Sequence, residues 1–452
     1  MARFLWNIPP VNLTVAALLV GSAYARPFFL EFPFSRLRGV DLVALALLIL
    51  VALFAHISEP RQSLFGSTLP RKARPLVLAL GLWLTTVTVS YVRFGISFEA
   101  FPSIAAVSLF FLLPVYVGLR WPRVDRKLLS WTLLIYLQFE VAASFLVSWA
   151  SHGELSLISW HLVNWSVNPN YVAGWISVIT LLTWYLILGE KGWLKTCALI
   201  VLGQTLLLVG LLDGQSWIFG VLVALLTLPL FMRITIRRRV ALLLQGALLS
   251  LIMILGPGVM DGLLSQRAQV NPVTKVVTGS LDIRTPPERF EKSLRLQLEQ
   301  PERSLQHEQP ALSPDIWLSL YTSNLPSGAK ERLVFWEDAI QKLNNNLLFG
   351  SGFQDAKVSD RSIFAGAEYH SELFTQIVAL GVVGLAAFLA IFAALWWWGG
   401  ALTRAMMLLV TPTLASDNAM SARSIWFGLA IALVIDVALH GHRSTETRSE
   451  QI

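Results

Sequence analysis

The sequence predicts an all-α polytopic membrane protein with about eleven or twelve transmembrane helices and one large helical loop outside the bilayer. Hydrophobic residues make up 55% of the chain and charged residues only 14%, whereas soluble globular proteins carry about 25% charged residues. The apolar residues also gather into runs long enough to cross a bilayer. The formal net charge is +7, but the basic residues flank apolar runs. The positive-inside rule and lipid phosphates account for this pattern, so we expect the lipid bilayer, and not nucleic acid, as a partner.

Hydropathy and charge divide the chain into predicted spans, which we place near 9–25, 39–57, 75–94, 102–119, 128–149, 171–188, 194–212, 216–232, 240–259, 374–398 and 424–439. The first span ends in Ser-Ala-Tyr-Ala before Arg26, which resembles a signal-peptide cleavage site. The many spans that follow favour an uncleaved anchor. The spans give three parts: an N-terminal transmembrane bundle of about nine spans (1–260), a loop domain (261–370), and C-terminal transmembrane helices with a tail (371–452).

Lysine and arginine predict the orientation of the chain. Basic residues cluster after the second, fourth and eighth spans, at Arg61, Arg71, Lys72, Arg74, Arg120, Arg123, Arg126, Lys127, Arg233, Arg237, Arg238 and Arg239. The loops near 95–101, 151–170 and 213–215 carry none. The basic loops and the N-terminus are therefore expected in the cytoplasm, although Arg26, Arg36 and Arg38 go against the pattern. The long segment 260–370 then lies outside the cytoplasm.

Two pieces of this long loop have helical patterns. Residues 287–305 mix charges with apolar residues, and residues 330–347 place Leu333, Trp336, Ile340, Leu343 and Leu347 at spacings of three and four. Prolines and a glycine between them mark turns. We expect a small cap of helices that lies over the membrane domain.

His370 lies where the loop turns into an apolar run. A histidine there can serve as a general base or a hydrogen-bond donor, and Ser371 can cap the helix that follows. The alternative is that both residues only cap the helix. Glu368 is two residues away and would not share a helix face with His370, and the single cysteine, Cys197, excludes a disulfide and a cysteine-rich site. We therefore predict no metal site.

Arg332 precedes Trp336 by four residues, and Gly350-Ser351-Gly352 follow. An arginine at the membrane surface can hold a diphosphate through two parallel hydrogen bonds. Arg332 can equally pair with Glu337 or Asp338 on its own helix. The glycines can simply end the helix and turn the chain.

Two polar turns lie at helix entrances on the same predicted side. Asn168 and Asn170 flank Pro169, where the proline fixes the approach and Asn170 can cap the helix. A very short turn, Asp213-Gly214-Gln215-Ser216, keeps polar groups at the membrane surface, where they can also line a site. For the first turn, structural capping is favoured over a binding role.

Together these pieces resemble the O-antigen ligase and polymerase superfamily of bacterial membrane glycosyltransferases. The resemblance is carried by Arg332-x-x-x-Trp336, by Leu-Leu-Phe-Gly-Ser-Gly at 347–352, and by His370-Ser371 followed after nine residues by Gly381. The Asn-Pro-Asn turn and Gly214-Gln215-Ser216 are similar to further family motifs. The similarity is strongest over 165–220 and 330–390, and in layout it covers most of the chain.

The resemblance implies a GT-C-like enzyme of the bacterial inner membrane, with the large loop in the periplasm. The donor would be a glycan on undecaprenyl diphosphate, and the acceptor a hydroxyl of lipid A-core or of another glycan chain. No metal or cofactor is implied. By matching positions, His370 would handle the acceptor hydroxyl and Arg332 the diphosphate. Weaker substrate-binding candidates are Arg284, Arg289 and Arg361, which match no family motif, together with Asn168, Asn170, Gln215, Ser216 and Ser371.

The sequence departs from the family in two places. Trp217 stands where many members have arginine after Gly-Gln-Ser. Members often have twelve spans, so either a weak span near 401–415 is missing from our set or the C-terminus lies outside. The His-Ser-nine-Gly spacing favours ligase over polymerase. A lipid-linked glycan transporter would also need many spans, and Glu140 within a span would suit either class, but the chain shows no paired halves.

Overall fold

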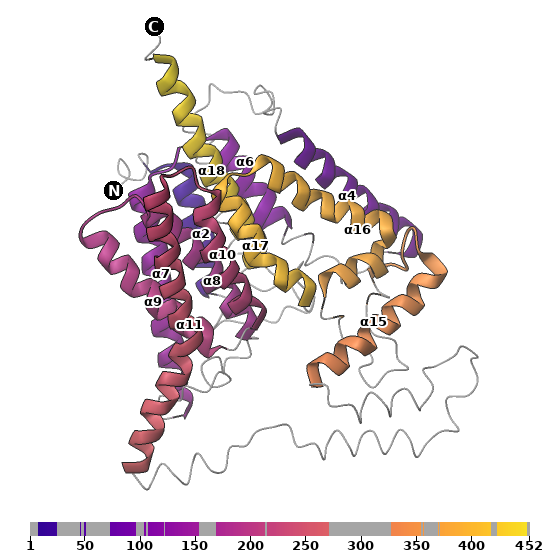
Figure 1. Ribbon diagram of the computed structural model, residues 1–452. Coiled ribbons are helices and arrows are strands. Elements are labelled where there is room, and N and C mark those ends of the chain that lie inside the picture. Colours follow the sequence, from indigo (N-terminus) through magenta and orange to yellow (C-terminus); the bar gives the residue numbers. More distant parts are fainter. Residues whose placement is uncertain are drawn as a thin grey trace.

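The computed structural model describes residues 8–24, 46, 49–50, 73–95, 104, 107–121, 123–152, 169–212, 215–270, 327–353, 356, 369, 371–416 and 423–449. Within these ranges every regular element is a helix, which confirms the all-α prediction (Figure 1). The helices are α2 (Pro10–Tyr24), α4 (Arg74–Phe94), η2 (Ser108–Leu112), α6 (Leu113–Arg120), α7 (Arg126–His152), α8 (Pro169–Ile187), α9 (Trp193–Leu211), α10 (Gln215–Phe231), α11 (Ile236–Val270), α15 (Ser327–Asn346), α16 (Glu372–Trp398), α17 (Ala401–Ser416) and α18 (Arg423–Ser449).

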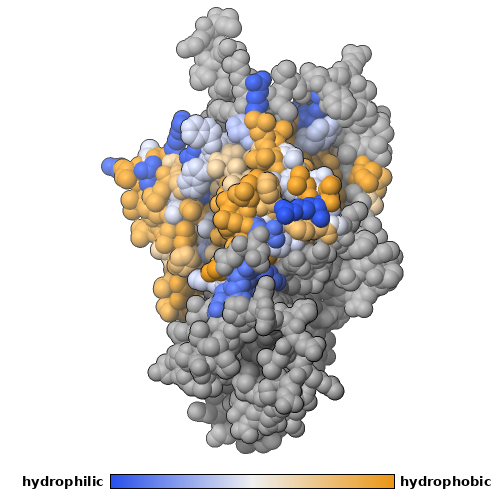
Figure 2. Space-filling model, turned by 90° about the vertical axis from the view of Figure 1, so that its right-hand side faces the viewer, coloured by the Kyte–Doolittle hydropathy of each residue, from blue (hydrophilic) through white to orange (hydrophobic). Residues whose placement is uncertain are grey.

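Where the structure describes them, the predicted spans coincide with helices, and most ends move by only a few residues. Two helices run further than predicted: α11 continues from the predicted end at 259 to Val270, and α18 from 439 to Ser449. The span predicted at 39–57 lies outside the described residues except for three isolated positions. Among the described residues, four helical stretches are long and apolar enough to cross a bilayer: Arg74–Phe94, Trp193–Leu211, Ile236–Val259 and Glu372–Trp398. Apolar side chains cover much of the described surface in Figure 2, as expected for a protein that faces lipid.

Helix α17 is the apolar helix that our set of spans lacks. It covers the weak segment near 401–415 and packs along α10 and against α18. The backbones of α10 and α17 approach closely, because a Cβ on Gly220 would lie 2.0 Å from the Leu409 carbonyl oxygen. The buried carboxylate of Asp436 in α18 accepts hydrogen bonds from the Thr403 amide (2.8 Å) and hydroxyl (2.7 Å). Asp436 thus satisfies an amide in the first turn of α17.

The basic segments meet at one end of the bundle. Arg126 donates to the Leu186 carbonyl (3.2 Å) and Arg238 to the Leu188 carbonyl (2.9 Å), so both arginines cover the C-terminal end of α8. The side chain of Asn12 in α2 donates to the Asp125 carbonyl at 2.8 Å. The segments 120–127 and 233–239, both predicted to be cytoplasmic, therefore share one end of the molecule. The side of the membrane on which this end lies stays a prediction.

Candidate functional site

Helix α16 is broken at Gly381. This residue has φ 69° and ψ −170°, a conformation that is open almost only to glycine. The break divides α16 into a first arm, residues 372–380, and a second arm, residues 382–398. Figure 1 shows the two arms meeting at an angle beside the end of α15, while the second arm runs along α4. The predicted span 374–398 is therefore not one straight helix.

The turn that follows α15 fills this break. The Ser351 and Gly352 amides donate to the carbonyls of Val378 (2.8 Å) and Ala379 (3.1 Å) at the end of the first arm. In return, the carbonyls of Leu347 (2.9 Å) and Leu348 (3.3 Å) accept from the first two amides of the second arm, Val382 and Val383. A broken helix leaves such groups without intrahelical partners. In a membrane they must be satisfied by protein, and the turn does so.

Glycines at 350 and 381 permit this close approach. A Cβ on Gly350 would lie 2.5 Å from the Ala379 carbonyl carbon, and a Cβ on Gly381 would lie 2.3 Å from the Leu348 carbonyl oxygen. Both residues also have a positive φ, 68° and 69°. The Gly-Ser-Gly turn thus does more than end α15. It seats on the break in α16, so two motifs that stand apart in the sequence form one structure.

A chain of buried polar side chains crosses from α4 to the first arm of α16. The Trp83 indole donates to Gln376 Oε1 (3.1 Å), and Gln376 Nε2 donates to Glu372 Oε1 (2.8 Å). All three side chains are fully buried. Because an indole can only donate, the carbonyl of Gln376 must face Trp83 and its NH₂ must face Glu372. Helix α4 therefore fixes the amide that binds a carboxylate within a membrane helix.

Sequence reasoning missed this chain. The signal was present, since Glu372 and Gln376 are four residues apart at the start of a strongly apolar run. Polar residues in such a run mark a functional site more often than a lipid-facing surface. Glu140, which sequence reasoning did single out, is fully buried in α7.

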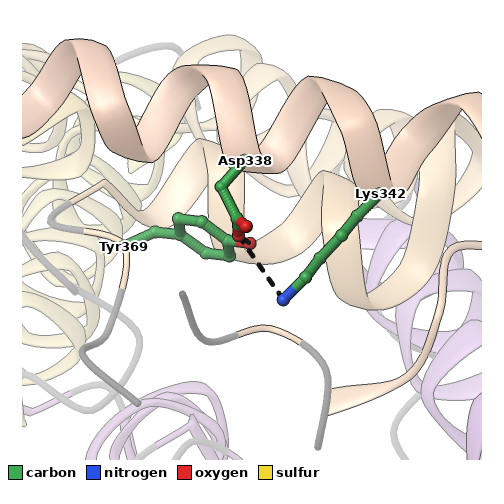
Figure 3. Close-up of polar contacts among 3 residues, drawn as sticks. All are labelled: Asp338, Lys342 and Tyr369. Atoms are coloured by element: carbon green, nitrogen blue, oxygen red, sulfur yellow. Dashed lines mark hydrogen bonds and ion pairs between the residues drawn. The ribbon is translucent and has the colours of Figure 1, made fainter. Parts of the chain in front are cut away.

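Tyr369, just before α16, binds the loop helix α15 (Figure 3). Its hydroxyl donates to Asp338 Oδ2 at 2.5 Å, and Lys342 Nζ lies 3.5 Å from the same oxygen. The Lys342 ammonium also lies 5.8 Å from the centre of the Tyr369 ring. Phe335 contacts that ring edge-on at 6.5 Å. Tyr369 is 1% exposed, so water does not compete for its hydrogen bond.

Helix α15 confirms the amphipathic helix predicted over 330–347, but the buried row differs from the predicted stripe. Phe335 and Ala339 are buried, whereas Trp336 (45%) and Ile340 (55%) of the predicted stripe are exposed. Trp336 still touches the first arm, with its ring 5.4 Å from that of Phe374. The buried face of α15 is therefore shifted by one residue from the predicted stripe, from Trp336 and Ile340 to Phe335 and Ala339. Partial burial also raises the pKa of Glu337.

Several predicted site residues lie outside the described residues: His370, Arg284, Arg289, Arg361 and Asn168. Arg332 and Asn170 are placed by their backbones alone, Arg332 within α15 and Asn170 in the first turn of α8. Ser371 is buried at the N-cap position of α16 with extended backbone (φ −162°, ψ 121°), but its side chain makes no capping hydrogen bond. The predicted position of Ser371 at the N-cap is therefore confirmed, but the predicted capping hydrogen bond from its side chain is not formed.

Gln215 and Ser216 begin α10, with Gln215 exposed and Ser216 half-buried. Helix α10 packs against α17, α11 and α8, so these two residues are placed by a different part of the bundle from α15. Trp217, at the position of the family's arginine, is buried. A Cβ on Gly174 of α8 would lie 2.7 Å from its ring. Trp217 thus serves to pack α10 against α8.

Within the described ranges, no group of three or more histidine, cysteine, aspartate or glutamate side chains is arranged to hold a metal ion. Residues 204–389 match a family model described as O-antigen ligase. The matched region begins in α9 and ends in the second arm of α16. It contains α15, the turn at 347–352 and the break at Gly381. No curated protein matches the sequence.

Proposed function

We propose, from the premise that this chain belongs to the O-antigen ligase and polymerase superfamily, that it transfers a glycan from undecaprenyl diphosphate to an acceptor hydroxyl. The observation that carries this proposal is the junction of α15 with the broken helix α16. Both lie in the matched region, and α15, the turn after it and the break at Gly381 belong to three of the motifs that carry the family resemblance. The protein would work in the bacterial inner membrane, with residues 261–370 as a periplasmic loop domain.

The described geometry suits a substrate that is half lipid and half polar. Helix α15 exposes Trp336 and Ile340, and the turn after it exposes Leu347, Leu348 and Phe349. A polyprenyl chain could lie along such an apolar surface in the bilayer. The polar Trp83–Gln376–Glu372 chain, buried between α4 and the first arm of α16, fixes that arm beside this apolar surface.

In the proposed reaction the acceptor oxygen attacks the anomeric carbon of the donor. The bond from that carbon to the diphosphate oxygen breaks, and undecaprenyl diphosphate leaves with the bonding electrons. His370 orients the acceptor hydroxyl and takes its proton. Arg332 stabilises the charge on the leaving diphosphate. The reaction as written needs no metal or cofactor.

The remaining candidates have supporting roles in this proposal. Arg284, Arg289 and Arg361 would add positive charge from the loop domain. Asn168, Asn170, Gln215, Ser216 and Ser371 would shape the membrane side of the site. We favour lipid A-core as the acceptor, which makes the protein an O-antigen ligase. The alternative is a repeat-unit polymerase for O-antigen or exopolysaccharide, in which the acceptor is a second lipid-linked chain.

A single assay tests the proposal. Purified protein in lipid nanodiscs is mixed with an undecaprenyl-diphosphate glycan, a chelator, and either lipid A-core or a second lipid-linked glycan. Product on lipid A-core indicates a ligase, and longer lipid-linked chains indicate a polymerase. His370→Ala and Arg332→Ala should each lower turnover by about 100-fold or more, as expected for a positioned acid–base group or a charge-stabilising donor.

Arg123→Ala is the matched control, since Arg123 is an exposed arginine in the predicted cytoplasmic segment 120–127, and it should keep full turnover. Full turnover of both His370→Ala and Arg332→Ala would refute the assigned roles. Absence of product with either acceptor would refute the function itself. Tags placed between α11 and α15 should react only with reagents outside the cytoplasm.

A further inference from the structure

The contact between Tyr369 and α15 has the features of a positioning device. A hydrogen bond from a phenol to a carboxylate is charge-assisted and directional, and this one is short, at 2.5 Å. Lys342 forms an ion pair with the same carboxylate oxygen, at 3.5 Å and on the same helix face, and so helps to hold that carboxylate in place. Since Tyr369 is buried, breaking the bond would leave its hydroxyl away from water.

This contact connects the two chain segments that carry the proposed catalytic residues. Asp338 and Lys342 belong to α15, the helix whose backbone also contains Arg332. Tyr369 comes directly before His370 in the sequence. The first arm of α16, which follows, is held against α4 by the hydrogen bond between Trp83 and Gln376. The hydrogen bond of Tyr369 therefore ties the helix of one proposed catalytic residue to the chain segment of the other.

We propose that Asp338, Lys342 and Tyr369 form a positioning clamp that sets α15 relative to the start of α16 and thereby controls the rate of glycan transfer. The clamp rests on the proposed function. Its residues are positioning residues that act through Arg332 and His370 and do not touch the reacting atoms. Loss of the clamp should therefore lower kcat and leave KM for the lipid-linked donor nearly unchanged.

Tyr369→Phe is the sharpest test, because it removes the hydroxyl and keeps the ring that Phe335 and Lys342 contact. A hydrogen bond to a charged group is worth about ten- to a hundred-fold in an equilibrium. We expect kcat to fall about tenfold while KM changes by less than about twofold. Tyr116→Phe is the matched control, since it removes a hydroxyl from an exposed tyrosine of α6, and it should leave both constants unchanged.

A double-mutant cycle then asks whether the side chains act as one unit. Asp338→Asn keeps the shape of the acceptor but removes the charge that strengthens the bond. It should lower kcat by about three- to tenfold, and the Asp338→Asn/Tyr369→Phe pair should be no slower than the slower single variant. Two effects that simply multiply, or a Tyr369→Phe enzyme as fast as the wild type, would overturn the proposal. The proposal would also be overturned if KM rose by as large a factor as kcat fell.

Hydrogen exchange of the substrate-free protein provides a readout that does not depend on catalysis. With the clamp lost, amides of residues 335–346 should exchange several-fold faster in Tyr369→Phe, and those of α9 should not change. If the wild type transfers no glycan to any acceptor, the proposed function is refuted. The hydrogen-exchange rates of α15 would still show whether the clamp holds that helix. Unchanged exchange in α15 would refute the clamp even in an active enzyme.

Discussion

Replacing Gly381 with alanine tests the junction between α15 and the broken helix α16. The substitution adds one methyl group at a residue with φ 69° and ψ −170°. That methyl group would lie 2.3 Å from the Leu348 carbonyl oxygen and 2.5 Å from the Phe349 amide nitrogen. Both are backbone atoms, so no side chain can rotate away to make room. The turn must move off the break.

The expected loss of stability has two parts. Forcing an L-residue into this conformation costs about 1–3 kcal/mol. Displacing the turn weakens the hydrogen bonds of the Ser351, Gly352, Val382 and Val383 amides, each worth about 1 kcal/mol net. If two to four of them are lost, the total comes to about 3–7 kcal/mol. That is a large part of the stability of an ordinary protein domain.

Two other glycines separate these parts. Gly192 has nearly the same backbone conformation (φ 68°, ψ −149°), but an added Cβ would meet nothing within 4 Å. Gly192→Ala should therefore show the strain alone, about 1–3 kcal/mol. Gly81 lies within α4, and its Cβ would also meet nothing within 4 Å. Gly81→Ala should be neutral or stabilising by up to about 1 kcal/mol, because alanine is the better helix former.

The measurement is graded SDS denaturation of the three variants and the wild type, followed by tryptophan fluorescence. Thermal midpoints from scanning fluorimetry provide a second readout. From most to least stable, the order should be Gly81→Ala, wild type, Gly192→Ala and Gly381→Ala. If Gly381→Ala is no less stable than Gly192→Ala, the close approach of the turn to the break is wrong, and the site built on it is wrong as well.

Three further predictions concern residues around the junction. Burial raises the pKa of Glu337 above its ordinary value of 4.5, so the stability of the wild type should fall as pH rises through the raised pKa. Glu337→Gln should therefore have the higher thermal midpoint at neutral pH. Below about pH 4 the midpoints of the variant and the wild type should converge. Trp83→Phe leaves the buried carbonyl of Gln376 without its donor and should lose about 1–3 kcal/mol in the SDS titration. In a cysteine-free background, a spin label at Ile340 should be relaxed mainly by oxygen and one at Gln341 mainly by a water-soluble nickel chelate. Equal nickel access at both would place α15 in water.

Hydropathy predicted most of the fold because a transmembrane helix is encoded locally. Each apolar run must satisfy its own backbone groups in the bilayer, and a helix does so within the run. Helix α17 escaped because Arg404 and Pro412 interrupt its apolar sequence. The tertiary structure accommodates this sequence, since the Arg404 side chain donates to the Trp396 carbonyl of α16 (3.2 Å) and α17 packs along α10.

The site was less predictable because its partners are far apart in the sequence. Trp83 and Gln376 are separated by 293 positions, and no pattern within either helix pairs them. For α15 the helical period was read correctly, yet it did not show which row of side chains would meet α16. The row that meets α16 contains the buried Phe335 and Ala339 and also the largely covered Asp338 and Lys342. A hydropathy pattern assigns these two charged residues to the polar face of the helix.

By itself, the sequence determined that this protein is a bundle of membrane helices, because twenty or so apolar residues have one stable form in lipid. It also determined which short motifs to watch. The tertiary structure alone decided that Gly381 is a break and not another turn of helix, because glycine permits both conformations. The choice depended on the amides and carbonyls of a distant turn, which satisfy the backbone groups that the break exposes.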